Sequence, residues 1–128
     1  MSKPILCLDF DGVIHSYTSG WKGADVIPDP PVPGAVGFIC DALPHFCVCI
    51  FSSRSCQPGG IDAMQVWLAE AFLAADMYPE AANKLLDQIE WPLEKPAAMV
   101  TIDDRALTFD GTWPAIESLK AFKPWNKK

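Results

Sequence analysis

Residues 5–14 read ILCLDFDGVI. A short apolar run, residues 5–8, leads directly into two acidic residues, Asp9 and Asp11, separated by one position. The run predicts a strand buried on both faces, since continuous short apolar runs are typical of such strands. Two carboxylates this close repel each other, and burial against a hydrophobic sheet penalises each charge. The stretch therefore predicts a positive group, such as a metal ion, between the two acids.

The chain has the length and composition of one globular domain. Half of its 128 residues are hydrophobic and a fifth are charged, so we interpret residues 1–128 as a single domain. Ten basic and 16 acidic residues give a net charge of −6. This charge argues against strong nonspecific nucleic-acid binding, which depends on Lys and Arg at the phosphates. We find no signal pattern and no apolar run of about 18 residues, so no membrane association is expected.

Cysteine usage gives a prediction of the cellular compartment. The five cysteines are odd in number and irregularly spaced: Cys7, Cys40, Cys47, Cys49 and Cys56. This usage favours reduced thiols and hence a cytoplasmic protein. Cys47 and Cys49 could suggest a metal pair, but no second Cys or His pair accompanies them, so we interpret them as core residues.

Strand and helix patterns alternate along the chain. We expect strands at residues 5–8, 46–51, 97–102 and 107–109, and helices at residues 35–43, 61–75, 80–88 and 113–122. Residues 12–33 are irregular and Pro-rich toward their end, which indicates a surface loop or small hairpin. The alternation predicts an α/β fold, a three-layer α/β/α sandwich with a parallel, Rossmann-like central sheet whose three major strands are buried.

Polar side chains follow three of these strands. Asp9 and Asp11 follow the first, residues 52–55 the second, and residues 103–105 the strand that ends at residue 102. Because the carboxyl ends of parallel strands form one edge of the sheet, we expect these groups in one crevice. Acids, hydroxyls and an Arg together predict a Mg²⁺ and phosphate site, and the ion would remove the repulsion between the acids.

Three of these stretches resemble motifs of the haloacid dehalogenase superfamily of phosphatases. LDFDGVI (8–14) resembles the first motif, CIFSSR (49–54) the second and VTIDDRA (100–106) the fourth. They occur in the family's order, and each falls at the end of an expected strand. The resemblance implies a Mg²⁺-dependent phosphomonoester hydrolase that acts through an aspartyl-phosphate.

The resemblance also implies roles for individual residues. Asp9 would be the nucleophile, and Asp11 the general acid that protonates the leaving oxygen and then the base that activates water. Ser52 would hydrogen-bond a phosphoryl oxygen. Mg²⁺ would be bound by Asp9, the backbone carbonyl of Asp11 and Asp104, with Asp103 as a supporting neighbour.

Further residues are expected on the substrate side of the same site. Gly12 and Ser53 belong to the first and second motifs, and Arg54 could reach the phosphate or the group attached to it. The family's third motif supplies a lysine that neutralises the nucleophile and the transferred group. Lys95, in LEKPAA, has the familiar Lys-Pro context and is favoured, with Lys84 as the alternative.

No cap domain fits in this chain, so the resemblance implies an open site. Residues 12–33 are too few for a cap, and the later insertion point is filled by two expected helices. Open members of the family act on large substrates, such as phosphorylated proteins or nucleic-acid ends. The alternative is a non-catalytic domain that keeps the metal and phosphate site to bind a phosphorylated ligand or partner. His15 is expected to be a solvated loop histidine, with a substrate contact as the alternative.

Overall fold

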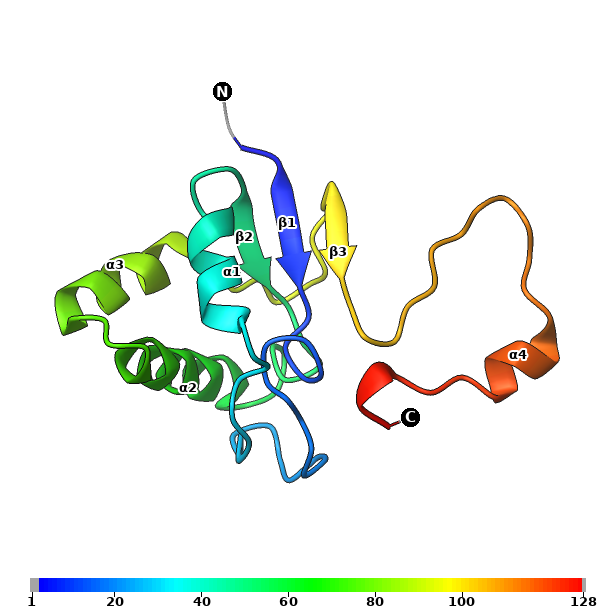
Figure 1. Ribbon diagram of the computed structural model, residues 1–128, viewed down its shortest axis with the longest axis horizontal. Helices are drawn as coiled ribbons and strands as arrows, with labels where there is room; N and C mark the ends of the chain where they lie inside the picture. The colour runs from blue at the N-terminus through cyan, green and yellow to red at the C-terminus, as the bar shows by residue number, and fades with distance from the viewer. Residues whose placement is uncertain (1–2, 128) are drawn as a thin grey trace.

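The computed structural model describes residues 3–127 as a mixed α/β fold around a small parallel sheet (Figure 1). The strands are β1 (Ile5–Leu8), β2 (Cys47–Ile50) and β3 (Val100–Ile102), in the order β2-β1-β3. Leu8 of the central strand pairs with Ile50 on one side and with Ile102 on the other. This register brings the carboxyl ends of all three strands to one edge, so the expected parallel α/β sheet is confirmed.

Helices fill the intervals between the strands. They are α1 (Ala35–Ala42), α2 (Gly60–Ala74), α3 (Pro79–Gln88) and α4 (Ile116–Lys120), followed by a 3₁₀ turn at Trp125–Lys127. The first three agree with the sequence prediction to within one residue at each end. In α2, the buried side chains of Met64, Leu68 and Phe72 recur every four residues, which is the spacing of one helical face. Residues 12–33 form no helix or strand beyond isolated bridges, as expected for a loop.

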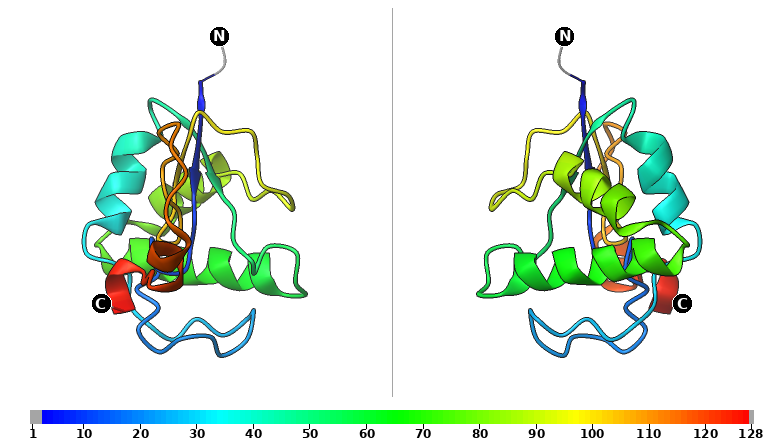
Figure 2. Two further views of the ribbon diagram at one scale, coloured as in Figure 1. Left: turned by 90° about the vertical axis from the view of Figure 1, so that its right-hand side faces the viewer. Right: turned by 90° about the vertical axis from the view of Figure 1, so that its left-hand side faces the viewer.

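The main hydrophobic core lies on one face of the sheet. Leu6, Leu8, Val48 and Ile50 form a buried cluster there with side chains from α1, α2 and α3. Figure 2 shows α1 on this side of the sheet and residues 91–99 on the other. Side chains alternate along a strand, so Cys7 and Cys49 face the side of residues 91–99, where they too are buried.

The last strand is less buried than its sequence predicts. Residues 97–102 were expected to form a buried strand, but β3 has only three residues, and Val100 and Ile102 are exposed. The reason is that β3 is an edge strand, paired on one side with β1 alone. The chain then leaves the sheet and runs outward as an arm (Figure 1).

The C-terminal arm, residues 105–123, is exposed throughout. The strand expected at residues 107–109 is wrong, because the arm leaves the sheet before it could pair with β3. The helix expected at residues 113–122 is shortened to α4, since the backbone of Ala115 is extended. The arm returns to the body at its end, where the indole N–H of Trp125 donates to the Gly12 carbonyl at 2.7 Å.

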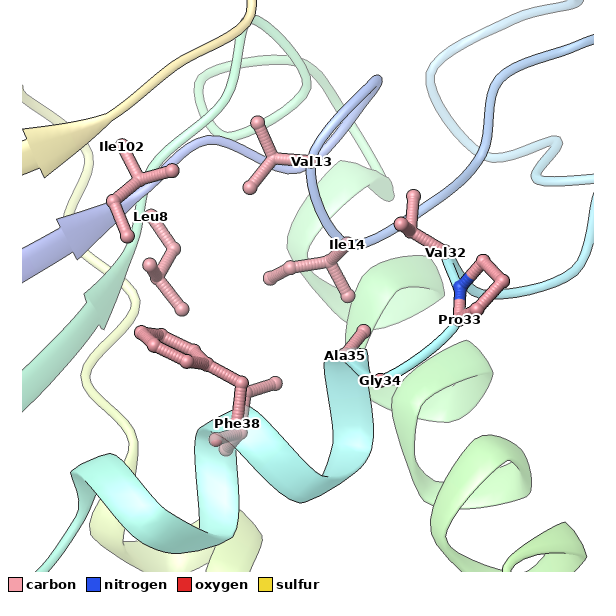
Figure 3. Close-up of a pocket in the computed structure, with 10 residues that line it drawn as sticks. Leu8, Val13, Ile14, Val32, Pro33, Gly34, Ala35, Phe38 and Ile102 are labelled. Atoms are coloured by element: carbon pink, nitrogen blue, oxygen red, sulfur yellow. The ribbon is translucent and has the colours of Figure 1, made fainter.

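An apolar pocket of about 260 Å³ lies on the α1 side of the sheet (Figure 3). Leu8 and Ile102 contribute to it from the strands, Ile14 from the loop after β1, and Phe38 from α1. Its lining holds no charged side chain, so it is distinct from the acidic edge of the sheet.

None of the helices among residues 3–127 has the length and apolar character needed to cross a bilayer.

The packing of α2 gives a stability prediction. Leu68 is fully buried in the core, whereas Val66 on the same helix is 59% exposed. We expect Leu68→Ala to lower the free energy of unfolding by about 2–5 kcal/mol, because it removes core contacts and leaves a cavity. Val66→Ala should change it by no more than about 0.5 kcal/mol. Urea denaturation of both variants measures the difference, and equal losses would contradict this description of the core.

Candidate active site

Three acidic side chains meet at the carboxyl edge of the sheet. Carboxylate oxygens of Asp9, Asp103 and Asp104 lie within 4.8 Å of one another. The backbone explains this approach, because the Asp9 N–H donates to the Ile102 carbonyl at 3.0 Å and continues the β1–β3 pairing past the strand end. Asp9 therefore lies beside the two acids that follow β3. We call these three residues the acidic triad.

The electrostatics of the acidic triad are unfavourable for three carboxylates. Burial, together with the charges of Asp103 and Asp104, raises the pKa of Asp9 to about 8, although a hydrogen bond from the Phe10 N–H opposes the shift. Burial also raises the pKa of Asp104. Burial and mutual repulsion therefore disfavour the ionised forms of Asp9 and Asp104, which is the situation that a bound cation would relieve.

Two further observations describe the surroundings of Asp104, which could hold a metal ion together with Asp9 and Asp103. The Asp104 Oδ1 atom is buried and has no hydrogen-bond partner in the described part of the chain, residues 3–127. Gly12 has a φ of 82° and lies so close that a Cβ there would overlap the Asp104 carboxylate. A residue with a side chain is therefore excluded at position 12 by both conformation and space. Carboxylate oxygens gathered in this way are the ligands that Mg²⁺ prefers.

The metal ligands expected from the sequence are only partly brought together. Asp9 and Asp104 are neighbours. Asp103 was expected only to support Asp104, but its carboxylate lies in the same cluster as those of Asp9 and Asp104. The Asp11 carboxylate is directed elsewhere, to Arg54 and His15. Binding of a metal by the Asp11 backbone carbonyl stays a prediction.

A small pocket of about 170 Å³ adjoins the acidic triad on the sheet face opposite α1. Its lining residues are Cys7, Asp9, Phe51, Ser52, Ser53, Lys95, Thr101 and Asp103. Lys95 reaches the pocket because residues 95–99 are not part of the short strand β3 and lie over this face as a loop. Lys84 is exposed on α3 and is not among the lining residues. This placement favours Lys95 over Lys84 as the lysine of the site.

The serines after β2 are held by a local turn. The Ser52 N–H donates to Ser55 Oγ at 3.0 Å, and the Ser52 Oγ accepts from the Arg54 N–H at 3.1 Å. Ser52 is buried and its Oγ already accepts one bond, so its hydroxyl proton is left to donate. Ser53 is exposed at the pocket.

Arg54 is fully buried, and its guanidinium contacts the protein itself. Its Nε donates to the two Asp11 carboxylate oxygens at 3.1 and 3.0 Å. Its Nη1 donates to the backbone carbonyls of Gly23, Ala24 and Val26 at 2.7 to 3.1 Å. Contact between Arg54 and a substrate phosphate stays a prediction. The sequence does not indicate the ion pair between Arg54 and Asp11, because nothing local to residue 54 signals burial.

His15 is a functional candidate whose environment differs from the one expected. The expectation of a solvated histidine is wrong, since the side chain is fully buried. Its Nδ1 lies 2.9 Å from Asp11 Oδ1, and its ring stacks on Phe10 and meets Trp67 edge-on. The four-residue spacing from Asp11 was the available signal, but residues 12–33 are irregular and spacing carries little weight outside a helix.

Comparison of the chain with protein-family models, with curated proteins and with solved structures finds no match. The chemistry of the edge is therefore inferred from its own residues. A carboxylate (Asp9), a cationic side chain (Lys95) and a hydroxyl donor (Ser52) share one pocket. Together with the acidic triad, this arrangement can hold a phosphoryl group beside a divalent cation.

The raised pKa of Asp9 gives a prediction for stability against pH. Between the ordinary value of 3.8 and the value of about 8, the folded protein holds a proton that the unfolded chain releases. Stability in chelator should therefore fall as the pH rises through this window. At pH 8 in chelator, Asp9→Asn should raise the free energy of unfolding by at least about 1 kcal/mol, the scale of one pKa unit, because the shift of Asp9 exceeds one unit. The gain should shrink at pH 5 and in Mg²⁺.

Chemical denaturation of the wild type and Asp9→Asn at both pH values, with chelator and with Mg²⁺, measures this difference. A destabilising effect of Asp9→Asn in chelator at pH 8 would mean that hydrogen bonds, rather than a cation, stabilise the Asp9 carboxylate.

Metal binding itself is testable without any substrate. If Asp104 is a ligand, Mg²⁺ should raise the melting temperature of the wild type, because binding favours the folded state. Asp104→Ala should abolish that rise, whereas Asp110→Ala, on the exposed arm, should retain it. Differential scanning fluorimetry across a Mg²⁺ titration makes the measurement. An unchanged response in Asp104→Ala would remove Asp104 from the metal site.

Proposed function

We propose that the protein is a Mg²⁺-dependent phosphomonoester hydrolase that acts through an aspartyl-phosphate intermediate, as its resemblance to haloacid dehalogenase phosphatases implies. The observation that carries the proposal is the shared pocket of Asp9, Ser52 and Lys95 beside the acidic triad. These residues come from three distant parts of the chain, and each has a side chain that phosphoryl transfer can use.

In the first half-reaction, a carboxylate oxygen of Asp9 attacks phosphorus. The Asp9 O–P bond forms as the bond from phosphorus to the ester oxygen breaks, and Asp11 gives its proton to that leaving oxygen. Mg²⁺, held by the acidic triad, would supply positive charge that lets one anion approach another. Lys95 offsets charge on the transferred phosphoryl group, and the Ser52 hydroxyl donates a hydrogen bond to one of its oxygens.

In the second half-reaction, Asp11 acts as the base. It takes a proton from water as the water oxygen bonds to phosphorus, and the bond between phosphorus and Asp9 breaks. Inorganic phosphate leaves and the Asp9 carboxylate is restored. Asp11 ends this step protonated, ready to protonate the next leaving group, so protons balance over the cycle.

The proposal extends to the architecture and the substrate class. A three-layer α/β/α order requires cover on both faces of the sheet, and the burial of Cys7 and Cys49 supports cover on the face opposite α1, where residues 91–99 lie as a loop. Residues 12–33 contain no cap domain, which supports an open site. Such a site suits a phosphate on a large substrate, such as a protein or a nucleic-acid end, in the cytoplasm. With a net charge of −6, a nucleic acid would be held by a few local contacts only.

A non-catalytic role is the second candidate, in which the edge binds a metal and a phosphorylated ligand without turnover. The observation that favours it is the engagement of Asp11, the expected acid and base, with Arg54 and His15. A binding domain would retain Mg²⁺-dependent affinity for phosphate and release none from esters.

A panel of phosphomonoesters, assayed for phosphate release with Mg²⁺ and with chelator, tests the hydrolase. We expect Mg²⁺-dependent release, with turnover abolished in Asp9→Asn because the attacking oxygen is lost. Lys95→Ala should lower kcat by about 100-fold, on the scale of one lost charge-stabilising donor. Lys84→Ala is the matched control and should leave turnover unchanged. Phosphate binding without release from any ester would support the binding domain instead.

A further inference from the structure

The carboxylate of Asp11 is held by two buried side chains that the proposed reaction does not otherwise use. His15 approaches Oδ1 at 2.9 Å, and the Nε of Arg54 donates to both oxygens. Both side chains have no exposed surface, so these contacts form away from water. Resting on the proposed function, we propose that His15 and Arg54 are positioning residues that fix the orientation of Asp11 and couple it to the loop of residues 12–33.

The hydrogen bonds of His15 determine which ring nitrogen donates to Asp11. The backbone N–H of Asp29 points at Nε2 from 3.1 Å, and an N–H can only donate, so Nε2 is the acceptor. The proton of the neutral ring is then on Nδ1, which donates to Asp11. The Asp29 carboxylate lies farther from Nε2, at 3.6 Å, and accepts from Ser19. His15 therefore offers Asp11 one directed donor.

Packing holds the His15 ring in this orientation. The ring stacks on Phe10 with centroids 5.6 Å apart and meets the edges of Tyr17 and Trp67 at 5.9 and 5.5 Å. Tyr17 has a φ of 60°, an uncommon conformation for a residue with a side chain, so the loop departs from preferred geometry beside the histidine. A ring packed on three sides cannot turn freely, so its bond to Asp11 has a fixed direction.

Arg54 connects Asp11 to the loop. Three backbone carbonyls of the loop accept from Nη1, and the ring of Trp21 lies over the guanidinium at 4.7 Å. The remaining nitrogen, Nη2, is buried and has no hydrogen-bond partner among residues 3–127. The donors of Nε and Nη1 thus link the Asp11 carboxylate directly to the backbone of the loop. Displacing residues 12–33 would remove the carbonyl acceptors of Arg54, and the guanidinium would then no longer be held in place beside the Asp11 carboxylate.

Comparing substrates with poor and good leaving groups shows whether His15 and Arg54 position Asp11 or only stabilise the fold. An alkyl phosphate needs protonation of its leaving oxygen, whereas 4-nitrophenyl phosphate releases a stable phenolate and needs little. A variant that misplaces Asp11 should therefore lose more activity on the alkyl ester. We expect His15→Ala and Arg54→Lys to lower kcat on an alkyl phosphate at least tenfold more than on the nitrophenyl ester. His15→Asn, which can place an amide N–H near the Nδ1 position, should recover part of the loss.

The control for the histidine is His45→Ala, which alters an exposed residue in the turn before β2 and should behave as wild type on both esters. The Mg²⁺-induced rise in melting temperature should persist in His15→Asn and Arg54→Lys, because the acidic triad is unchanged. That rise shows that a variant with low activity is folded and has an intact metal site.

A second comparison places the same substitutions in Asp11→Asn. If His15 and Arg54 act through Asp11, His15→Asn and Arg54→Lys should have little further effect on alkyl-ester turnover there. Equal losses on the two esters, or losses that add fully to that of Asp11→Asn, would overturn the inference and leave the hydrolase standing. Failure of the wild type to hydrolyse either ester would overturn the proposed function, and the inference with it.

Discussion

The buried guanidinium of Arg54 is the charge on which the arrangement of the edge depends. A cation without solvent contact is tolerated only when acceptors surround it. Here the acceptors are the Asp11 carboxylate and three carbonyls of an otherwise irregular loop. Gly60, at the start of α2, packs so tightly on the Arg54 backbone carbonyl that any side chain there would overlap it. The loop after β1, the turn after β2 and the start of α2 are thus fixed by one residue.

The acidic side chains at this edge of the sheet differ in whether protein groups balance their charge. When Asp11 is ionised, a protein cation and a directed N–H donor match its negative charge within the fold. Among residues 3–127, the acidic triad has no comparable partner. Arg105, its nearest guanidinium, lies 4.0 Å from Asp104, and its side chain is 58% exposed. The edge therefore separates a carboxylate matched by protein groups from a cluster that could hold an external cation. Under the proposed function, this division separates the proton-transfer group from the phosphoryl-transfer group.

Sequence patterns predicted the parts of the fold that depend on local composition. The apolar runs at β1 and β2 and the four-residue spacing in α2 were sufficient, because burial of those faces follows from periodicity. The convergence of Asp9 and Asp104 also followed, since parallel strands end at one edge. The exposure of β3 did not follow, because it depends on whether another strand pairs with the outer edge. Residues 107–109 have the composition of such a strand but leave the sheet.

The hydrogen-bond partners of the buried polar side chains could not be predicted from the local sequence either. Arg54 looks like a phosphate ligand in SSR, and only the three-dimensional course of residues 12–33 shows that carbonyls surround it. His15 looks like a loop residue for the same reason. Lys95 is the opposite case: its position relative to the edge depends on how few residues β3 contains. Each outcome depends on the path of a segment without regular structure, which composition does not determine.

The order of the strands along the chain also affects the order in which the edge is made during synthesis, because β3 comes after β1 and β2. Asp11 and Arg54 are both synthesised before β3, so they can pair while synthesis continues. Asp103 and Asp104 reach the edge only after most helices have been made. The repulsion within the acidic triad is therefore absent while the helices fold and arises only when β3 adds to β1. Under the proposed function, a nascent chain can acquire the core before the triad is complete, and the addition of β3 is the step at which the availability of a divalent cation would matter.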